Sequence, residues 1–390
     1  MMVMDKYFLV SLLLLYIVVK VAAADDDDDS SSAYRYPYLT SQSLFISNYQ
    51  KMISDLKIYA YPQPPQVEQG RRHHHPSSLF HSSLLKSPFL TTDGNRAHLF
   101  YLPISTINSS RTTARLIRDL RSNYPYWNRT LGADHFYVSS ASGEGGEVRY
   151  QSNRNMVELK KNSVRITPAN DNNDYEGKSL FVPHKDIILP SAAAAAAATP
   201  LGLVPTAAAA DAKFLILVKG ASDEKRAAGL LSELRADPDF HLLHQENTIG
   251  RLPRFRLFVT YGYGGDETGD HPLSEIGEAL QSGWVPLILS LSDRPVLDLP
   301  FADLLKWSEI AVFVGGGGGG GSKEMMKKRL FSLSSGSGYE RMRELGKMSA
   351  RHFVWNHPSP PLPSSAYDAF HTLLYQLWMR RHVVRYTRHN

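Results

Sequence analysis

Phe214-Leu215-Ile216-Leu217-Val218 is an unbroken run of five apolar residues, typical of a strand that is buried on both faces of a sheet. A helical pattern follows at 223–236, and strand patterns return at 256–259 and 285–289 with a second helix, 273–282, between them. Because neighbouring parallel strands are joined by crossovers that usually contain a helix, this alternation predicts an α/β fold built on a parallel sheet.

A second set of strand patterns lies earlier in the chain. We predict strands within 56–61, 97–103, 133–138 and 185–190, and a helix over 113–121. Proline or glycine bounds each of these strands, as expected where a strand gives way to a turn. This part of the sequence therefore predicts an α/β lobe of its own.

Residues 191–212 separate the two sets. They contain two alanine runs, which favour helix, but two prolines and a glycine interrupt them. We predict a linker over 191–212 between an N-terminal lobe, 55–190, and a C-terminal lobe, 213–390. The closing helices, predicted at 339–353 and 366–381, are assigned to the C-terminal lobe.

The N-terminus is apolar. Residues 7–19 contain one polar residue, Ser11, and apolar residues resume at 21–24 after Lys20. This length fits a short membrane span, and it also fits a signal peptide cleaved near Ala23; either would send the rest of the chain across the endoplasmic reticulum membrane. We predict that residues 1–24 remain attached as a signal anchor, followed by a polar luminal stem over 25–54.

Two acceptor sequons are compatible with a luminal domain. They are Asn108-Ser109-Ser110 and Asn128-Arg129-Thr130, and we predict glycosylation at Asn108 and Asn128.

Composition excludes several classes of protein. The 390 residues include 43 Lys plus Arg against 38 Asp plus Glu, a formal net charge of +5 that is too small to indicate nucleic acid binding. The chain has no cysteine, which excludes disulfides, thiolate zinc sites and a cysteine nucleophile. Three adjacent histidines, His73 to His75, cannot all face one ion without an irregular backbone, so we predict a loop there and no metal site.

Two glycine-rich segments fail the nucleotide-binding fingerprints. The seven glycines at 315–321 precede Ser322-Lys323, which reverses the order of lysine and serine that a phosphate loop requires. Gly262-Tyr263-Gly264 lacks the third glycine of the dinucleotide motif. We predict a flexible loop at 315–321.

Several segments, in order, resemble the exostosin family of glycosyltransferases, and its plant branch in particular. In the N-terminal lobe they are Lys57-Ile58-Tyr59-Ala60-Tyr61, residues 97–103, Tyr124-Pro125-Tyr126-Trp127-Asn128-Arg129, Gly132-Ala133-Asp134-His135-Phe136 and residues 185–190. In the C-terminal lobe they are residues 276–280, 283–288, 299–303, 307–308, 367–371 and 377–381. The resemblance covers about residues 55–385, and the order of the segments is more specific than any one of them.

The resemblance implies a GT-B-like fold, in which two Rossmann-like lobes face a cleft, the first serving the acceptor and the second the donor. It implies transfer of a sugar from a nucleotide sugar to a plant cell-wall polysaccharide of pectin, xyloglucan or xylan type. It also implies a single-pass type II protein of the Golgi membrane with a luminal catalytic domain. Other glycosyltransferases are expected as hetero-oligomer partners. No cofactor is expected, because folds of this type can stabilise a leaving diphosphate without a metal ion.

Three residues of the second lobe are candidate donor-binding residues by this resemblance. Glu278 matches a family acid associated with the hydroxyls of the donor, and Arg226 matches an arginine suited to the diphosphate. Ser274 lies one turn before Glu278 near the start of the helix predicted over 273–282, where it would cap the helix or contact the diphosphate. Taken alone, Glu278 is better explained as a solvated helix acid, and Arg226 could equally be a surface arginine. No catalytic residue is assigned.

The sequence also departs from the family pattern. Ser140-Ala141-Ser142-Gly143 stands where the family usually has cysteine, histidine, aspartate and tryptophan. Glu275 replaces a cation that would lie near the diphosphate, and Lys219 replaces a glycine. An alternative function is therefore a catalytically inactive scaffold or binding subunit of a polysaccharide-synthesis complex.

Overall fold

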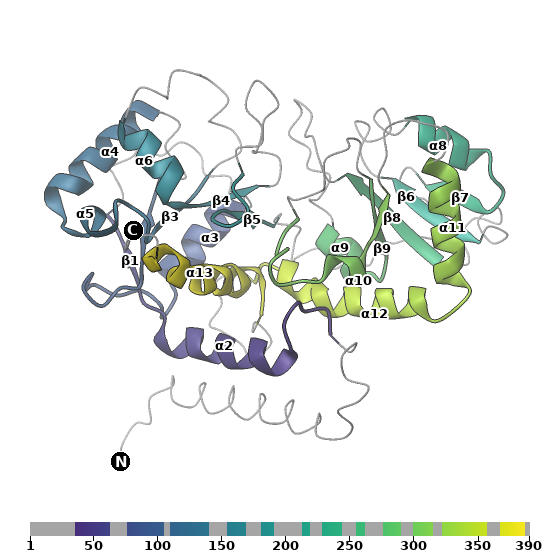
Figure 1. Cartoon of the computed structure of the whole chain (residues 1–390), viewed down its shortest axis with the longest axis horizontal. Helices are drawn as coiled ribbons and strands as arrows, with labels where there is room; N and C mark the ends of the chain where they lie inside the picture. The colour runs from purple at the N-terminus through teal and green to yellow at the C-terminus, as the bar shows by residue number, and fades with distance from the viewer. Residues whose placement is uncertain are drawn as a thin grey trace, which may run out of the picture.

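The computed structural model describes residues 36–62, 76–104, 110–139, 154–168, 181–190, 213–218, 228–243, 255–261, 276–289, 299–314, 322–356 and 367–386. Two lobes lie side by side, and each is built on its own five-stranded parallel sheet (Figure 1). This confirms the predicted α/β class and fits a GT-B-like arrangement of two lobes. The signal-anchor segment 1–24, the linker 191–212, His73 to His75 and the glycine run 315–321 lie outside the described residues.

The first sheet has the strand order β1-β2-β3-β4-β5, with every pair parallel. Its strands are β1 (Ile58–Ala60), β2 (Leu99–Leu102), β3 (His135–Val138), β4 (Val164–Pro168) and β5 (Ile187–Leu189). Leu90 forms a parallel bridge to Ile58 on the outer side of β1, where Ile58 N–H donates to Phe89 O and Thr91 N–H donates to Ile58 O. The chain thus steps outward from β1 before it crosses back to β2. This reversal of direction is the feature that defines a doubly wound sheet.

Helices cover both faces of the first sheet. α4 (Ser110–Asn123), α5 (Tyr126–Thr130) and α6 (Arg154–Asn162) pack on one face, and α3 (Pro76–Leu85) packs on the other. The side chains alternate accordingly, because successive residues of a strand point to opposite faces. Phe100 and Leu102 of β2 face α4, whereas Leu99 and Tyr101 face α3.

The second sheet has the order β10-β9-β8-β6-β7, again with every pair parallel. Its strands are β6 (Phe214–Val218), β7 (Phe240–Leu243), β8 (Phe255–Tyr261), β9 (Val285–Leu289) and β10 (Val312–Val314). The chain moves outward from β6 to β7 and then returns to place β8 on the other side of β6. The topological switch point of this lobe therefore lies between β6 and β8.

One face of the second sheet packs against α8 (Ala228–Arg235), α11 (Ser322–Ser334) and part of α12 (Gly338–Ala350). The short helix α9 (Ile276–Gln281) packs on the opposite face, and α10 (Trp307–Ile310) precedes β10. The five buried residues of β6 are the apolar run of the sequence, and their burial on both faces is what that run predicted.

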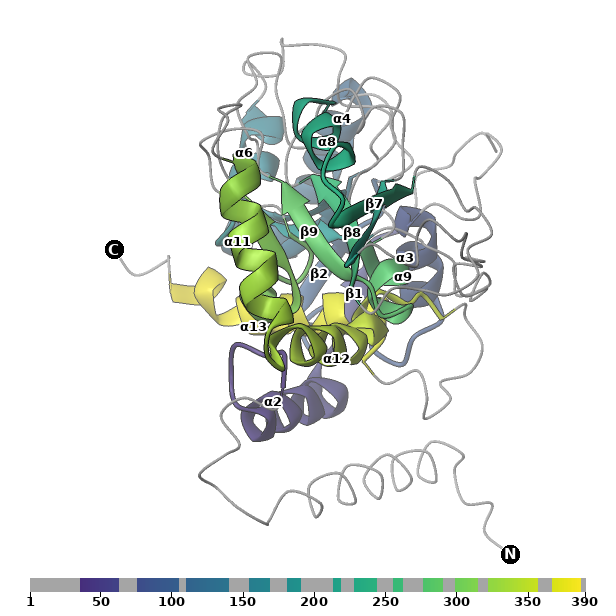
Figure 2. The same cartoon turned by 90° about the vertical axis from the view of Figure 1, so that its right-hand side faces the viewer.

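A single hydrophobic core continues from one lobe into the other. It contains strand residues of the first sheet, such as Tyr101 and Phe136, together with Leu280 and Ile288 of the second lobe. The helices α2 (Gln42–Asp55) and α13 (Ala369–Tyr386) and the 3-10 turn η4 (Arg351–Phe353) also belong to it. α12 and α13 lie along the lower side of the molecule with α2 beneath them (Figure 1, Figure 2). We call this cluster the bridging core.

The structure corrects the predicted stem over 25–54. Residues 42–55 form α2, and its Phe45, Tyr49 and Met52 are buried in the bridging core. These residues follow the helical spacing of four and three, but they lie among polar residues that hid the pattern. Just before α2, Leu39 N–H donates to Leu304 O and Lys306 N–H donates to Pro37 O, so this part of the chain is joined to the second lobe.

The structure also corrects the assignment of the last helix to the second lobe. Phe370 of α13 lies 5.6 Å from Phe80 of α3 between ring centroids, so α13 packs under the first sheet. Arg380 of α13 donates to the carbonyl of Asp186 beside β5 and, at 2.7 Å, to the carboxylate of Asp303 in the second lobe. α13 therefore joins the two lobes. Sequence order alone could not reveal this, because the contact partners lie nearly two hundred residues away.

Several further elements were not predicted. They include α3, which begins at Pro76 directly after the histidines predicted to lie in a loop, and α6, β4, β7 and α11. The strands predicted in 56–61, 97–103, 133–138 and 185–190 are confirmed as β1, β2, β3 and β5. Within the described residues, no helix combines the length and apolar composition needed to cross a bilayer.

His352 lies at the centre of the bridging core and is fully buried. Its Nδ1 lies 2.8 Å from Thr372 Oγ1, and its Nε2 lies 3.2 Å from the Tyr38 hydroxyl. Thr372 donates its own hydrogen to Asp368 O, so it accepts from His352 Nδ1–H. Tyr38 in turn accepts a hydrogen bond from Arg351 and donates to His352 Nε2. Both ring nitrogens of a neutral His352 are thus satisfied.

The buried position of His352 predicts acid sensitivity. Burial, reinforced by the charge of Arg351, lowers the pKa of His352 to about 3. Between the ordinary histidine pKa of about 6.5 and this value, the unfolded chain binds a proton that the folded chain does not, so stability is complete above that range and falls as the pH falls through it. From pH 6.5 to 5 the loss should be about 2 kcal/mol.

His352→Gln should reduce this slope, because an amide can donate and accept hydrogen bonds without titrating. Part of the slope remains, because burial also lowers the pKa of His135. Urea unfolding at several pH values measures the effect. His184→Gln, which makes the same substitution at an exposed histidine, is the control. Equal slopes for the wild type and His352→Gln would show that His352 does not cause the acid sensitivity.

Candidate functional site

The carboxyl edge of the second sheet is the first candidate site. Open α/β sheets bind ligands outside the carboxyl ends of their strands at the switch point, which here lies between β6 and β8. β6 ends at Val218 and β8 ends at Tyr261, and the two strands are paired in parallel with Val218 opposite Val259. The segments 219–227 and 262–275 therefore leave the sheet from neighbouring strand ends.

These two segments contain two of the predicted donor residues. Arg226 lies in the first and Ser274 in the second, and both residues fall outside the described part of the chain, as does Glu275. The strands that precede these segments, β6 and β8, are paired in parallel and end side by side at one edge of the sheet. This is a consequence of topology that the sequence did not show.

Glu278, the third predicted residue, lies in the first turn of α9. It is half-buried, whereas its neighbours Ile276, Gly277, Ala279 and Leu280 are all buried. α9 follows β8 and returns the chain to β9, so its first turn lies toward the carboxyl edge of the parallel sheet. The helix was predicted over 273–282, and its described part is shorter at both ends.

α9 is held between the second sheet and the bridging core. Ala279 packs with Leu217 and Trp284 on the face of the sheet, and Ile276 and Leu280 pack into the bridging core. Gly277 lies against Phe353 of η4, and a Cβ atom at Gly277 would lie 2.4 Å from Phe353 Cβ. The contact leaves no room for a side chain, so the position of Glu278 depends on the packing of η4.

Trp284 has a packing role. It is buried with Leu215, Leu217 and Phe258 on the face of the sheet that α9 covers. The Arg256 guanidinium lies 5.9 Å from its ring centre. Trp284 therefore fills the core beneath α9.

A polar chain that the sequence did not single out lies on the first sheet. His135 Nδ1 lies 2.8 Å from the Asp134 carboxylate, and its Nε2 lies 2.9 Å from the Tyr61 hydroxyl. Burial lowers the pKa of His135, so the ring is neutral, donates from Nδ1 to Asp134 and accepts from Tyr61. Tyr61 directly follows β1, so the hydrogen bonds from Asp134 through His135 to Tyr61 fix the end of this edge strand.

This polar chain is a structural feature. His135 is completely buried, and the Tyr61 and Phe100 rings are stacked with it at centroid distances of 5.6 and 4.9 Å. A substrate cannot reach its nitrogens without displacing those rings. The signal that could have found it was the segment Gly132 to Phe136, which the family resemblance includes.

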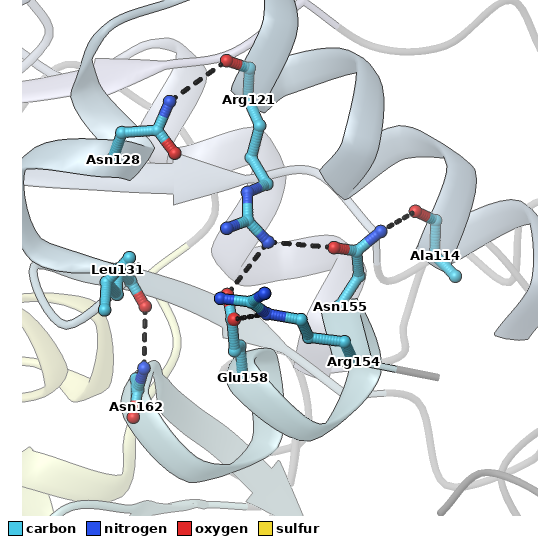
Figure 3. Close-up of polar contacts among 8 residues, drawn as sticks. All are labelled: Ala114, Arg121, Asn128, Leu131, Arg154, Asn155, Glu158 and Asn162. Atoms are coloured by element: carbon cyan, nitrogen blue, oxygen red, sulfur yellow. Dashed lines mark hydrogen bonds and ion pairs between the residues drawn. The ribbon is translucent and has the colours of Figure 1, made fainter. Parts of the chain in front are cut away.

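The remaining sequence predictions have simple outcomes. Asn128 is exposed on α5 and its amide donates to Arg121 O at 3.2 Å (Figure 3), while Asn108 lies outside the described residues. Among the described residues, no group of three His, Asp or Glu side chains is arranged to hold a metal ion. Neither finding tests glycosylation or metal dependence.

The comparisons with known proteins identify the family. Residues 52–316 match the model of the exostosin GT47 domain. The chain belongs to the exostosin family of glycosyltransferases. A probable glycosyltransferase of Arabidopsis thaliana is 27% identical over 370 residues, 87% of this chain and 70% of the relative. A probable beta-1,4-xylosyltransferase of the same plant is 33% identical over 368 residues, 83% of this chain and 81% of the relative.

A probable glucuronosyltransferase of Oryza sativa subsp. japonica is 23% identical over 368 residues, 83% of this chain and 80% of the relative. The similar proteins are plant glycosyltransferases, which confirms the resemblance found in the sequence. The exostosin match ends shortly after β10, whereas α12 and α13, which complete the bridging core, lie beyond it.

The contact between Gly277 and Phe353 predicts a specific glycine requirement. Gly277→Ala should destabilise the protein by about 1–3 kcal/mol, because the added methyl must move α9 or η4. Gly336→Ala is the matched control, since no atom lies within 4 Å of the position of its added Cβ. Thermal unfolding of the two variants measures the difference. Equal unfolding temperatures would show that α9 is not held against η4.

Proposed function

We propose that this exostosin-family enzyme transfers a sugar from a nucleotide-sugar donor to a plant cell-wall polysaccharide of pectin, xyloglucan or xylan type. It acts in the Golgi lumen as a single-pass type II membrane protein anchored by residues 1–24. The apolar run at residues 7–19 and the family membership support this location. The names of the relatives, which include xylosyl- and glucuronosyltransferases, support a polysaccharide acceptor.

The observation that carries the proposal is the topology of the second sheet around its switch point. The switch point between β6 and β8 starts the segments of Arg226 and Ser274 at one edge, and α9 presents the half-buried Glu278 in its first turn. The described ends of β6 and β8 and the first turn of α9 thus lie toward the edge where α/β sheets bind nucleotides, which supports a donor site there. A nucleotide sugar needs partners of two kinds there, a cation for its diphosphate and acceptors for its hydroxyls.

The chemistry of the three side chains fits these needs. The Arg226 guanidinium can form paired hydrogen bonds to a diphosphate, and the Ser274 hydroxyl can donate another. The Glu278 carboxylate can accept two hydrogen bonds from neighbouring sugar hydroxyls. Because the leaving diphosphate gains negative charge as the glycosidic bond breaks, fixed donors at this edge stabilise the transition state without requiring a metal ion.

Glu278→Gln tests the donor site. The substitution should weaken nucleotide-sugar binding about tenfold or more, because loss of a charged hydrogen bond costs roughly 1.5–3 kcal/mol. Calorimetry with each common nucleotide sugar measures the affinity and also identifies the donor. Glu233→Gln, which changes an exposed acid on α8 of the same lobe, should have no effect. Tight donor binding by the wild type that Glu278→Gln leaves unchanged would remove α9 from the donor site.

Glu275→Arg separates the enzyme from the alternative, an inactive scaffold or binding subunit. In the enzyme, the arginine adds to an existing cationic site and should strengthen donor binding. In a scaffold that lost its donor site through this residue, the wild type binds no nucleotide sugar and the variant gains binding. Titration of the wild type and the variant with nucleotide sugars distinguishes the enzyme from the scaffold. Absence of donor binding in both proteins would refute the proposed transferase.

A further inference from the structure

Positive charge is concentrated on the helices that cover one face of the first sheet. α4, α5 and α6 together carry eight basic side chains and two acidic ones. The basic residues are Arg111, Arg115, Arg118, Arg121, Arg129, Arg154, Lys160 and Lys161, and the acidic residues are Asp119 and Glu158. Their net charge of +6 exceeds the +5 of the whole chain. The rest of the protein is therefore close to neutral, and this layer is not.

Three of these arginines form a stripe on α4. Arg111, Arg115 and Arg118 are all exposed, and their spacing of four and three residues places them on one face of the helix. The opposite face of α4 is buried, since Ile117 and Leu120 pack into the core of the first lobe. We call Arg111, Arg115 and Arg118 the α4 stripe.

The acidic residues neutralise little of the stripe. Asp119 pairs with Arg118 at 3.1 Å, but the side chains are 56% and 66% exposed, so solvent weakens the pair. Within the described part of the chain, no acidic side chain forms an ion pair with Arg111 or Arg115. The stripe is thus available to an anion from solution.

Contacts between α4 and α6 fix the geometry of this surface (Figure 3). Arg121 donates to Asn155 and Glu158, both at 2.9 Å, and Arg154 donates to the other oxygen of Glu158 at 2.7 Å. Asn155 also donates to the carbonyl of Ala114. Glu158 therefore accepts hydrogen bonds from two arginines, and these contacts hold α4 and α6 side by side. A ligand that binds here loses little entropy in ordering the backbone.

Aromatic side chains lie at the end of α4. Tyr59, Tyr124 and Tyr126 are each half-buried and pack against one another at ring distances of 5.4 to 6.4 Å. The Arg129 guanidinium lies 4.9 Å from the Tyr126 ring centre and donates to Asn95 at 2.7 Å. Tyrosine offers an apolar face and a polar tip, which together suit a sugar ring with its own apolar face and hydroxyl rim.

The position of the stripe connects it to the acceptor side of the proposed reaction. α4 begins at Ser110, shortly after β2 ends at Leu102, and runs back along the outside of the lobe (Figure 1). Arg111 therefore lies nearest the carboxyl edge of the first sheet, the edge where α/β lobes bind ligands. A chain-like ligand on the stripe would lead toward that edge.

We propose that the α4 stripe and the adjacent tyrosines bind an acidic polysaccharide, one whose sugar units carry carboxylates, and guide it to the acceptor side of the enzyme. This inference rests on the proposed transfer to a polysaccharide and narrows the class of acceptor. The charge excess selects an anionic ligand, and the neighbouring tyrosines select a carbohydrate among anions. An anionic bilayer fits less well, because an interfacial helix needs a free apolar face and that of α4 is buried.

The test compares two triple variants of the full-length protein. Arg111→Gln/Arg115→Gln/Arg118→Gln removes the stripe, and Lys51→Gln/Lys86→Gln/Lys328→Gln removes the same charge from exposed, scattered positions. Binding of polygalacturonate, neutral xyloglucan and phosphatidylserine vesicles is measured for each at low and at physiological ionic strength. Thermal unfolding checks the fold, and nucleotide-sugar titration checks the donor site independently.

The stripe variant should bind polygalacturonate about tenfold more weakly than the wild type, as expected for three exposed charge contacts, with the control changed about twofold at most. The difference should shrink as salt is added. Equal losses in both variants, equal wild-type affinity for the acidic and neutral polymers, or tighter binding to vesicles than to polygalacturonate would each overturn the proposal. If the wild type binds polygalacturonate through the stripe but binds no nucleotide sugar, the proposed transferase is refuted and the proposed polymer site is not.

Discussion

The structure depends on the burial of His352 and the aromatic and aliphatic side chains around it between the two lobes. Every polar atom of that imidazole has a partner, so the desolvation of a titratable ring is offset without a charge. The two partners come from distant parts of the chain, Tyr38 near its beginning and Thr372 in α13, and Arg351, the residue before His352, donates to Tyr38 in turn. Because all three must be in place together, the arrangement of the lobes is tied to a single cooperative core.

That core also sets the geometry of the candidate donor site. Phe353, the neighbour of His352, presses on Gly277, and Gly277 is the residue before Glu278. The helix that carries Glu278, α9, also packs against the second sheet, where Ala279 contacts the cluster of Leu217 and Trp284. The side chain proposed to hold the donor is therefore positioned by residues that lie outside the site, including η4, which follows the end of the exostosin match. Variants of the core should affect donor binding indirectly.

The first lobe contributes in a different way. Its buried polar chain, from Asp134 through His135 to Tyr61, holds the end of β1 and is closed to substrate by stacked rings. Its outer helices instead carry a surplus of positive charge that exceeds that of the whole protein. Stability and recognition thus depend on opposite faces of the same helix: Ile117 and Leu120 of α4 face the sheet, and the arginines of the α4 stripe face solvent.

The sequence by itself determined the α/β class, most of the strands and the family, because a buried parallel strand is a local run of apolar residues and the ordered motifs of the family are local too. It predicted Glu278 as a candidate by resemblance, and the first turn of α9 is where the structure places it. Only the tertiary structure decided that α2 belongs to the core and that α13 returns to the first lobe, as the contacts of Met52 and Phe370 show. It alone showed the strand orders that start the segments of Arg226 and Ser274 at one edge of the second sheet. These features arise from contacts between residues that are far apart in the sequence, which no local pattern of hydrophobicity can encode.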